Sequence, residues 1–313
     1  MTWSPPPPVR ERYWLHALLL GLTLVTTTWT GAMQWLSFQM DFGNVVPRVS
    51  LIALALDGLW YGLTILAILG AHELGHYLAC RYYGISASLP YFIPLPPLIA
   101  MTGTAGAFIR IRQPITTKRA LFDIGIAGPL AGFVVAVPAL FLGLTLSRVV
   151  ELPPNLNGMF ELGEPLLFKA AAWLVWGPLP DHQSINLHPM AFAAWFGLLA
   201  TALNLLPIGQ LDGGHLAYAV FGRNSIWVTR ITLAALTSLV IYTSVLLASY
   251  SLAVFTAIAA ALLFRFGWHH PPTWDEHEPL DQTRLAFAVL ALVIFVVCFT
   301  PLPLTLIETV QPK

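Results

Sequence analysis

The chain contains few charged residues. Asp, Glu, Lys and Arg make up 10% of its 313 residues, whereas soluble domains carry about 25%. Hydrophobic residues make up 57%, and the mean hydropathy is +0.73. Such a chain lacks the polar surface that a water-soluble protein needs, so we predict an integral membrane protein embedded in a lipid bilayer. The formal net charge is zero, which argues against nucleic acid as a partner.

Cysteine is almost absent. The chain has two, Cys80 and Cys298, and both lie in apolar segments. This number excludes a disulfide framework and a CxxC metal site, so we expect both to be small buried residues. Internal repeats are also missing, and no polar connection is long enough to form an additional domain. We therefore predict a disordered arm over residues 1–13 and a single membrane-embedded domain over 14–313.

Long apolar runs dominate the rest of the chain. A membrane-spanning helix needs about 20 apolar residues, and seven segments are candidates: 14–35, 50–80, 121–146, 189–206, 226–247, 251–266 and 285–307. The apolar segment 166–176 is too short to span, so a re-entrant or interfacial position suits it better. The predicted fold is an all-α polytopic membrane protein of about seven transmembrane helices with a small membrane-associated β element. Its core covers about 58–221, followed by C-terminal helices over 226–307.

The basic residues predict the orientation, because cytoplasmic loops carry an excess of Lys and Arg. An N-terminus inside leaves four basic residues outside, namely Arg48, Arg148, Lys169 and Lys313. The inner side then receives Arg10, Arg12, Arg81, Arg110, Arg112, Lys118, Arg119, Arg223, Arg265 and Arg284. We therefore predict a cytosolic N-terminus.

The stretch HELGH contains ionisable residues in an apolar run, where they are costly and need a reason. His72 and His76 are four residues apart, so on a helix they share one face and can reach one metal ion. Glu73 can take a proton from a water molecule that the metal has acidified. A structural alternative is that neighbouring polar groups satisfy both histidines inside a helical bundle.

A third ligand is expected from another apolar segment, because catalytic zinc usually has three protein ligands and one open position. Residues 201–220 offer Asp212, in a stretch that Pro207 and Gly209 interrupt. Broken backbone at membrane depth is tolerated where protein buries it or where it lines a wet cavity. Asn204 could stabilise an oxyanion or serve as an interhelical hydrogen-bonding residue. His215 fits a position behind the ligands better than a fourth ligand, which would close the site.

These two motifs resemble those of the site-2 protease family of intramembrane zinc metalloproteases. HExxH lies on one apolar segment, and N-x-x-P-x-x-x-x-D-G, from Asn204 to Gly213, lies on a later one; the resemblance also covers GIAGPLAGF at 125–133. It implies one catalytic zinc ion held by His72, His76 and Asp212, with Glu73 as the general base. One departure is Gly132, where many relatives carry an asparagine, which leaves Asn204 as the main oxyanion candidate.

A β element is expected between the first motif and the middle helix. Prolines exclude a continuous helix over 86–114, and the second half of this segment alternates in polarity, which is typical of a strand or hairpin. An edge strand there could hold an extended substrate by β-augmentation. Family members are similar in having a membrane re-entrant β element at this place. The substrate-binding candidates are Gly106, Ala107, Phe108, Ile109 and Arg110; the alternative is a proline-rich connector without a substrate role.

The predicted function is hydrolysis of peptide bonds in or near the transmembrane segment of a single-span substrate protein. An ion transporter is the alternative class, since transporters also place ionisable residues on broken helices, and an inactive scaffold is a third. A transporter needs no glutamate between two histidines and commonly has repeated halves. We expect a prokaryotic plasma membrane with the active site toward the cytosol. Two further segments, 148–188 and the His-rich stretch with His269, His270 and His277, are expected to be solvated loops. The sequence does not indicate the substrate, the gate or the oligomeric state.

Overall fold

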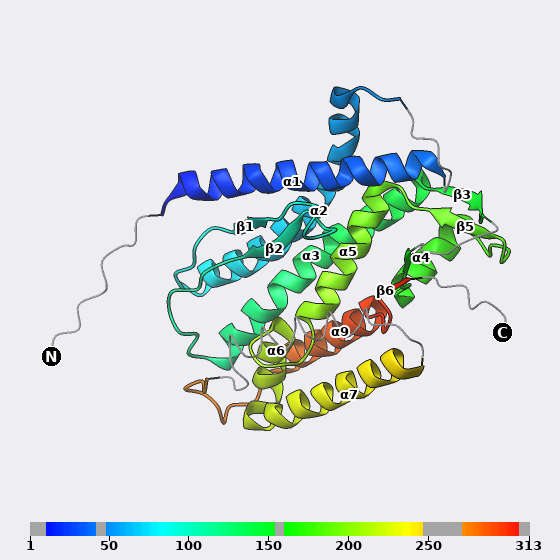
Figure 1. Cartoon of the computed structure of the whole chain (residues 1–313). Helices are drawn as coiled ribbons and strands as arrows, with labels where there is room; N and C mark the ends of the chain where they lie inside the picture. The colour runs from blue at the N-terminus through cyan, green and yellow to red at the C-terminus, as the bar shows by residue number, and fades with distance from the viewer. Residues whose placement is uncertain (1–10, 42–47, 154–159, 247–270, 307–313) are drawn as a thin grey trace.

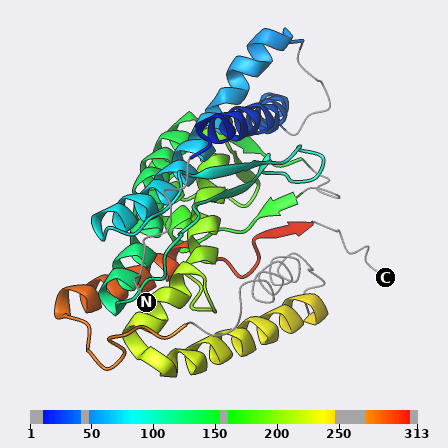
Figure 2. The same cartoon turned by 90° about the vertical axis from the view of Figure 1, so that its left-hand side faces the viewer.

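The computed structural model describes residues 11–41, 48–153, 160–246 and 271–306. These residues form a bundle of helices with three small two-stranded sheets. Two views put helix α1 (Tyr13–Met40) and helix α7 (Ser225–Leu246) on opposite faces of the bundle (Figures 1 and 2).

Helix α2 (Leu51–Tyr82) packs closely against α1. The Ser50 side chain caps its start by accepting a hydrogen bond from the backbone N–H of Ala53 at 3.2 Å. Where the two helices cross, Gly58 lies so close to α1 that a Cβ atom there would be 2.4 Å from the carbonyl oxygen of Thr28. Glycine at this position therefore permits close contact between two membrane helices.

The centre of the bundle is formed by helices α3 (Lys118–Leu146) and α5 (Pro189–Asn204). Leu140 and Leu144 of α3 pack with Trp195 and Leu198 of α5 in the main hydrophobic core. All four side chains are fully buried. Helix α3 also contacts α2 on one side and helix α6 (Asp212–Phe221) on the other, so it connects both segments that carry the predicted metal ligands.

The C-terminal half begins with α6. A short 3-10 turn, η1 (Gly222–Asn224), connects it to α7. Gly222 has φ +57°, a left-handed conformation that glycine adopts without steric cost, and the chain turns here from α6 into α7. Helix α9 (Gln282–Cys298) then packs against α5 and against the short helix α4 (Leu166–Trp176).

The first sheet is an antiparallel hairpin of β1 (Tyr91–Pro94) and β2 (Thr104–Phe108), which lies beside α1. Its turn reaches the buried part of α2, because the Tyr61 hydroxyl donates to the carbonyl of Thr102 at 3.0 Å. Leu98 and Ile99 at the tip are strongly exposed. The β element predicted between the first motif and the middle helix is therefore present as a hairpin with an exposed apolar tip.

The other two sheets are antiparallel and small. In the first, β3 (Arg148–Glu151) pairs with β5 (Gln183–Asn186), and in the second β4 (Phe160–Leu162) pairs with β6 (Leu304–Leu306). They contain parts of the predicted 148–188 loop, and Figure 1 shows them at the end of the bundle near α4. This part of the loop is therefore ordered by strand pairing.

Four helical segments are long and apolar enough to cross a membrane in the described part of the chain: α1, α2, α3 and the stretch Asp212–Val245, of which α7 is the longer part. The predicted spans 189–206 and 285–307 correspond to helices of 16 and 17 residues, and 251–266 lies outside the described residues. In the described residues, length and composition therefore support four of the seven predicted spans. Helix α9 ends at Cys298, because the prolines at 301 and 303 cannot continue a helix.

The crossing of α1 and α2 gives a first prediction. Gly58→Ala should lower stability by roughly 1–3 kcal/mol, because the new methyl group would press on the backbone of α1, which cannot move without separating the helices. Thermal unfolding of the purified protein in detergent measures this. Gly21→Ala on α1 is the control, since a Cβ atom at Gly21 would meet nothing within 4 Å. Equal unfolding temperatures for the two variants would contradict the close crossing.

Candidate metal centre

Helix α2 supplies two of the candidate ligands from its buried interior. His72 and His76 are 7% and 8% exposed. Their Nε2 atoms lie 3.1 Å apart, as expected for side chains four residues apart on one helical face. Both nitrogens therefore point to the same side of α2, toward α3 and the start of α6.

Asp212 lies at the beginning of α6, just after the break that the sequence predicted. The chain turns tightly between the helices, with a hydrogen bond from the N–H of Leu211 to the carbonyl of Ile208 at 3.1 Å. Gly213 packs on the end of α5, since a Cβ atom there would be 2.1 Å from the carbonyl oxygen of Leu205. The Oδ2 atom of Asp212 is 3.3 Å from the Nε2 atoms of both His72 and His76.

These three atoms form a triangle of the size that a zinc ion requires. Its sides are 3.1, 3.3 and 3.3 Å, and a tetrahedral site with bonds of about 2.0–2.1 Å has ligand atoms about 3.3 Å apart. The donor set of two imidazoles and one carboxylate is also one that zinc accepts. The residues present therefore fit the metal. Within the described residues, the group that could hold an ion consists of His72, His76 and Asp212, without His215.

Helix α3 makes room for the two imidazoles. A Cβ atom at Gly128 would lie 2.1 Å from Nε2 of His76, and one at Gly132 would lie 3.2 Å from Cβ of His72. The two glycines are four residues apart, as the two histidines are, and each faces one histidine across the helix pair. The sequence analysis used the stretch 125–133 only as part of the family resemblance and gave its glycines no individual role. The equal spacing of four was the signal that could have matched them to the histidines.

Helix α3 also orients His76. The Nδ1 atom of His76 lies 2.7 Å from the carbonyl oxygen of Ile124. A carbonyl can only accept a hydrogen bond, so Nδ1 carries the proton and, in the neutral ring, Nε2 keeps its lone pair for a metal. This backbone contact was not predicted, because nothing in the side chain of Ile124 indicates it.

Glu73 is 8% exposed and follows His72 directly. The backbone N–H of Ile109, just after β2, is directed at this carboxylate. The predicted substrate strand and the predicted base therefore lie next to each other. Asn204, the last residue of α5, is also close, with its Nδ2 atom 3.4 Å from Nε2 of His72.

The other substrate-binding candidates belong to the same hairpin. Gly106 and Ala107 lie in β2, and Phe108 at its end stacks on Tyr91 of β1 with ring centroids 5.4 Å apart. The backbone N–H of Arg110 donates to the Ser88 hydroxyl at 2.9 Å. In the described part of the chain β2 pairs with β1 alone, so its other edge has no strand partner.

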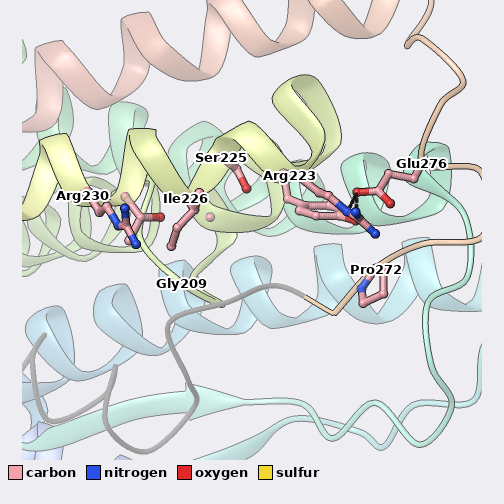
Figure 3. A pocket seen from close by; sticks show the side chains of 10 residues that line it. Gly209, Arg223, Ser225, Ile226, Arg230, Pro272 and Glu276 are labelled. Atoms are coloured by element: carbon pink, nitrogen blue, oxygen red, sulfur yellow. Dashed lines mark hydrogen bonds and ion pairs between the residues drawn. The ribbon is translucent and has the colours of Figure 1, made fainter.

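The segment 271–281 is more ordered than a solvated loop. The Asp275 carboxylate accepts a hydrogen bond from the backbone N–H of Lys118 at 2.8 Å, at the start of α3. Glu276 forms an ion pair with Arg223 at 3.0 Å. Glu276 and Arg223 line a pocket of about 400 Å³ (Figure 3) beside α6 and α7. Of the three histidines predicted in this loop, His277 is exposed, and His269 and His270 lie outside the described residues.

Gly214 and Tyr218 contribute the wall of this pocket on α6. They are four residues apart and share one face of the helix. Asp212 and His215 face α3 instead, where a Cβ atom at Gly125 would meet the Cβ of His215 at 3.1 Å and the carbonyl oxygen of Asp212 at 3.6 Å. The pocket is therefore separated from the metal centre by the body of α6.

Comparison with known proteins adds the family. The model of peptidase family M50 matches residues 60–248, which include both motifs. The chain belongs to peptidase family M50. The matched region contains every candidate metal-centre residue described above and ends before α9.

Several curated plant proteins are similar to this M50 chain. The "Probable zinc metalloprotease EGY2, chloroplastic" of Oryza sativa subsp. indica is 33% identical over 217 residues, which cover 67% of this chain and 37% of the relative. EGY1 of Arabidopsis thaliana is 36% identical over 171 residues, covering 52% and 29%. EGY3 of Oryza sativa subsp. indica is 30% identical over 257 residues, covering 76% and 40%. The alignments thus span less than half of each relative's length.

These relatives correct one prediction. All three are named as chloroplast proteins, which contradicts the predicted prokaryotic plasma membrane and, with it, the predicted cytosolic side for the N-terminus and the active site. They are also named as zinc metalloproteases, which supports zinc as the cofactor. The predicted plasma membrane was wrong because composition and apolar runs indicate a membrane but carry no information on which membrane it is.

The contact between α3 and His76 gives a second prediction. Gly128→Ala should weaken zinc binding by at least about tenfold, because the methyl group would displace the imidazole from its position. Competition with a chromophoric chelator measures the affinity of the purified protein. Gly21→Ala serves again as the control and should bind zinc as the wild type does. Unchanged zinc affinity in Gly128→Ala would mean that His76 is not held in this position.

Proposed function

We propose that the chain is an intramembrane zinc endopeptidase that cuts a peptide bond in or near the transmembrane segment of another protein. The observation that carries this proposal is the convergence of His72, His76 and Asp212 on one point, with Glu73 beside them and an unpaired strand edge within reach. Membership of peptidase family M50 and the names of the relatives support it.

In this proposal His72, His76 and Asp212 hold the metal. When bound, zinc supplies a Lewis acid that polarises the scissile carbonyl and acidifies a water molecule. Glu73 would accept a proton from the attacking water as the new C–O bond forms, and would deliver it to the amine nitrogen as the C–N bond breaks. The amide N–H₂ of Asn204 donates to the carbonyl oxygen as negative charge develops on it. Ile124 holds the His76 ring through its Nδ1–H.

The substrate would bind as an extended strand along β2. A helix hides its peptide carbonyls in its own hydrogen bonds, so a transmembrane segment must unwind before it can be cut. Residues Gly106 to Arg110 would offer their main-chain groups to the unwound segment by β-augmentation. Because Ile109 touches Glu73, a strand added at this edge would pass directly over the proposed base. We infer a single-span membrane protein as the substrate.

For the architecture, we propose one membrane-embedded domain over 14–313, with a core at about 58–221. Helices α5 and α9 would cross most of a bilayer in spite of their length, because neighbouring helices bury their polar backbone ends. The seventh predicted span, 251–266, lies outside the described residues. We place the protein in a chloroplast membrane, following the relatives.

Substitution of the base tests the proposal. Glu73→Gln should keep full zinc content and lose cleavage by about 10²–10⁴-fold, because an amide cannot accept the proton. Asp212→Ala should lose zinc and cleavage together. Zinc content and cleavage of a panel of single-span proteins are measured on the same detergent-solubilised preparations. Glu151→Gln, an exposed glutamate on β3, is the control and should cleave as the wild type does.

Two results would contradict this function. If the folded wild-type protein contains no zinc, the proposed catalytic site is refuted. Zinc flux into proteoliposomes without cleavage of any substrate would favour the transporter instead.

Asn204 gives a separate prediction. Asn204→Ala should lower kcat by about 10²–10³-fold with little change in KM or zinc content, since the lost hydrogen bond forms with the transition state. Steady-state cleavage kinetics with one substrate of the panel measure both constants. A rise in KM with unchanged kcat, or loss of zinc, would show that Asn204 serves substrate binding or the position of His72.

A further inference from the structure

Three helices are tied together by one polar cluster near the metal centre. The guanidinium of Arg284, on α9, donates through Nε and Nη2 to the two carboxylate oxygens of Asp123, on α3, at 2.9 and 2.5 Å. The hydroxyl of Tyr83, which caps the end of α2, donates to the same carboxylate. We call these three residues the Asp123 cluster.

The orientation of Arg284 is fixed from a second side. Asp281 precedes α9, and its carboxylate caps the helix by accepting from the backbone N–H of Arg284 at 3.0 Å. It also accepts from Nη1 of the same guanidinium. Arg284 is therefore held between two carboxylates, and its planar fork matches Asp123 in the bidentate geometry that makes such pairs strong and directional. The side chains of Arg284 and Asp123 are only 23% and 29% exposed.

The Asp123 cluster lies one residue from the group that orients a metal ligand. Asp123 directly precedes Ile124, whose carbonyl accepts the Nδ1–H of His76 at 2.7 Å. At the end of helix α2, Tyr83 lies seven residues after His76, which is about 10 Å along the helix axis. The cluster thus joins the end of α2 to the first turns of α3, on the side of the His76 contact where the two helices are connected by the chain.

We propose that Asp123 and Arg284 are positioning residues for the metal centre, which act through Ile124 on the His76 imidazole. This inference rests on the proposed function and extends it to α9. Arg284 lies outside the residues that the M50 family model matches, so the C-terminal helix acquires a role in metal binding. Neither side chain touches zinc or substrate. Their effect is to hold the Ile124 carbonyl where Nε2 of His76 meets His72 and Asp212.

The test measures zinc affinity of the full-length protein in detergent by chelator competition. Arg284→Gln and Asp123→Asn should each weaken zinc binding by about 10-fold or more, as is typical when the partner that orients a ligand is disturbed. Arg284→Lys keeps the charge but loses the bidentate fork, so its affinity should lie between wild type and Arg284→Gln. The double variant should lose no more zinc affinity than the single variant with the larger loss, because both substitutions remove one connected interaction.

The matched control is Arg148→Gln. It removes an arginine–carboxylate pair with Asp41, 3.6 Å apart, which joins the end of α1 to the start of β3, beyond the opposite end of α3 from Asp123. Its zinc affinity should stay within about twofold of wild type, whatever its unfolding temperature. Cobalt-loaded protein gives a second readout: the visible bands should shift in Arg284→Gln and remain as in wild type in Arg148→Gln.

The outcomes separate the two proposals. Wild-type affinity and cobalt spectrum in Arg284→Gln and Asp123→Asn, even with a lowered unfolding temperature, would overturn the positioning role and leave a structural tie. If Arg284→Gln does not fold, Tyr83→Phe removes only one hydrogen bond to Asp123 and should still weaken zinc binding in the same direction; unchanged affinity there overturns the proposal equally. A wild type that binds no zinc would instead refute the proposed function itself.

Discussion

The structure depends on bringing two imidazoles and a carboxylate to within 3.1–3.3 Å of one another inside an apolar bundle. Without a metal ion, such a cluster is costly in a membrane interior. The surrounding helices are arranged to make it possible. Helix α2 presents both histidines on one face, the break before α6 turns Asp212 toward them, and α3 lies between these two segments with glycine where side chains would collide.

The proposed function gives a β hairpin a role in a helical membrane protein. On that proposal, a peptide bond can be cut only when its carbonyl is free, and an extended substrate needs hydrogen-bond partners inside the bilayer. The end of β2 meets the Glu73 carboxylate through Ile109, so the strand and the base are neighbours. The Tyr61 hydroxyl binds the turn of the hairpin to α2. This contact fixes the strand relative to the helix that carries His72 and His76.

Much of the candidate site could be predicted from the sequence, because its chemistry is local. The spacing of His72 and His76 follows from one helical turn, and the helix break before Asp212 follows from Pro207 and Gly209. The contacts that hold these residues could not be predicted in the same way. The carbonyl of Ile124 has no signal in a side chain, and Arg284 reaches Asp123 across 161 residues of chain.

The fold was predicted less well than the site. Hydropathy measures the length of an apolar run but not where a helix within it begins or ends. The run 189–206 is a 16-residue helix followed by a tight turn, and the run 285–307 contains a helix, two prolines and a strand. The loop 271–281 looked polar and proline-rich, yet Asp275 ties it to the first turn of α3. Prolines end the helix in the run 285–307, whereas a tertiary contact orders the loop 271–281.

The pairing of His72 with Gly132 and of His76 with Gly128 also limits how the protein can move. If α3 slid along α2 by one turn, about 5.4 Å, the side chain of Ile124 or Ala136 would meet an imidazole in place of a glycine. Intermediate positions are also blocked, since Gly75 lies against the backbone of Ala127. These two helices therefore form a fixed frame, and motions that admit a substrate must take place in the elements around it.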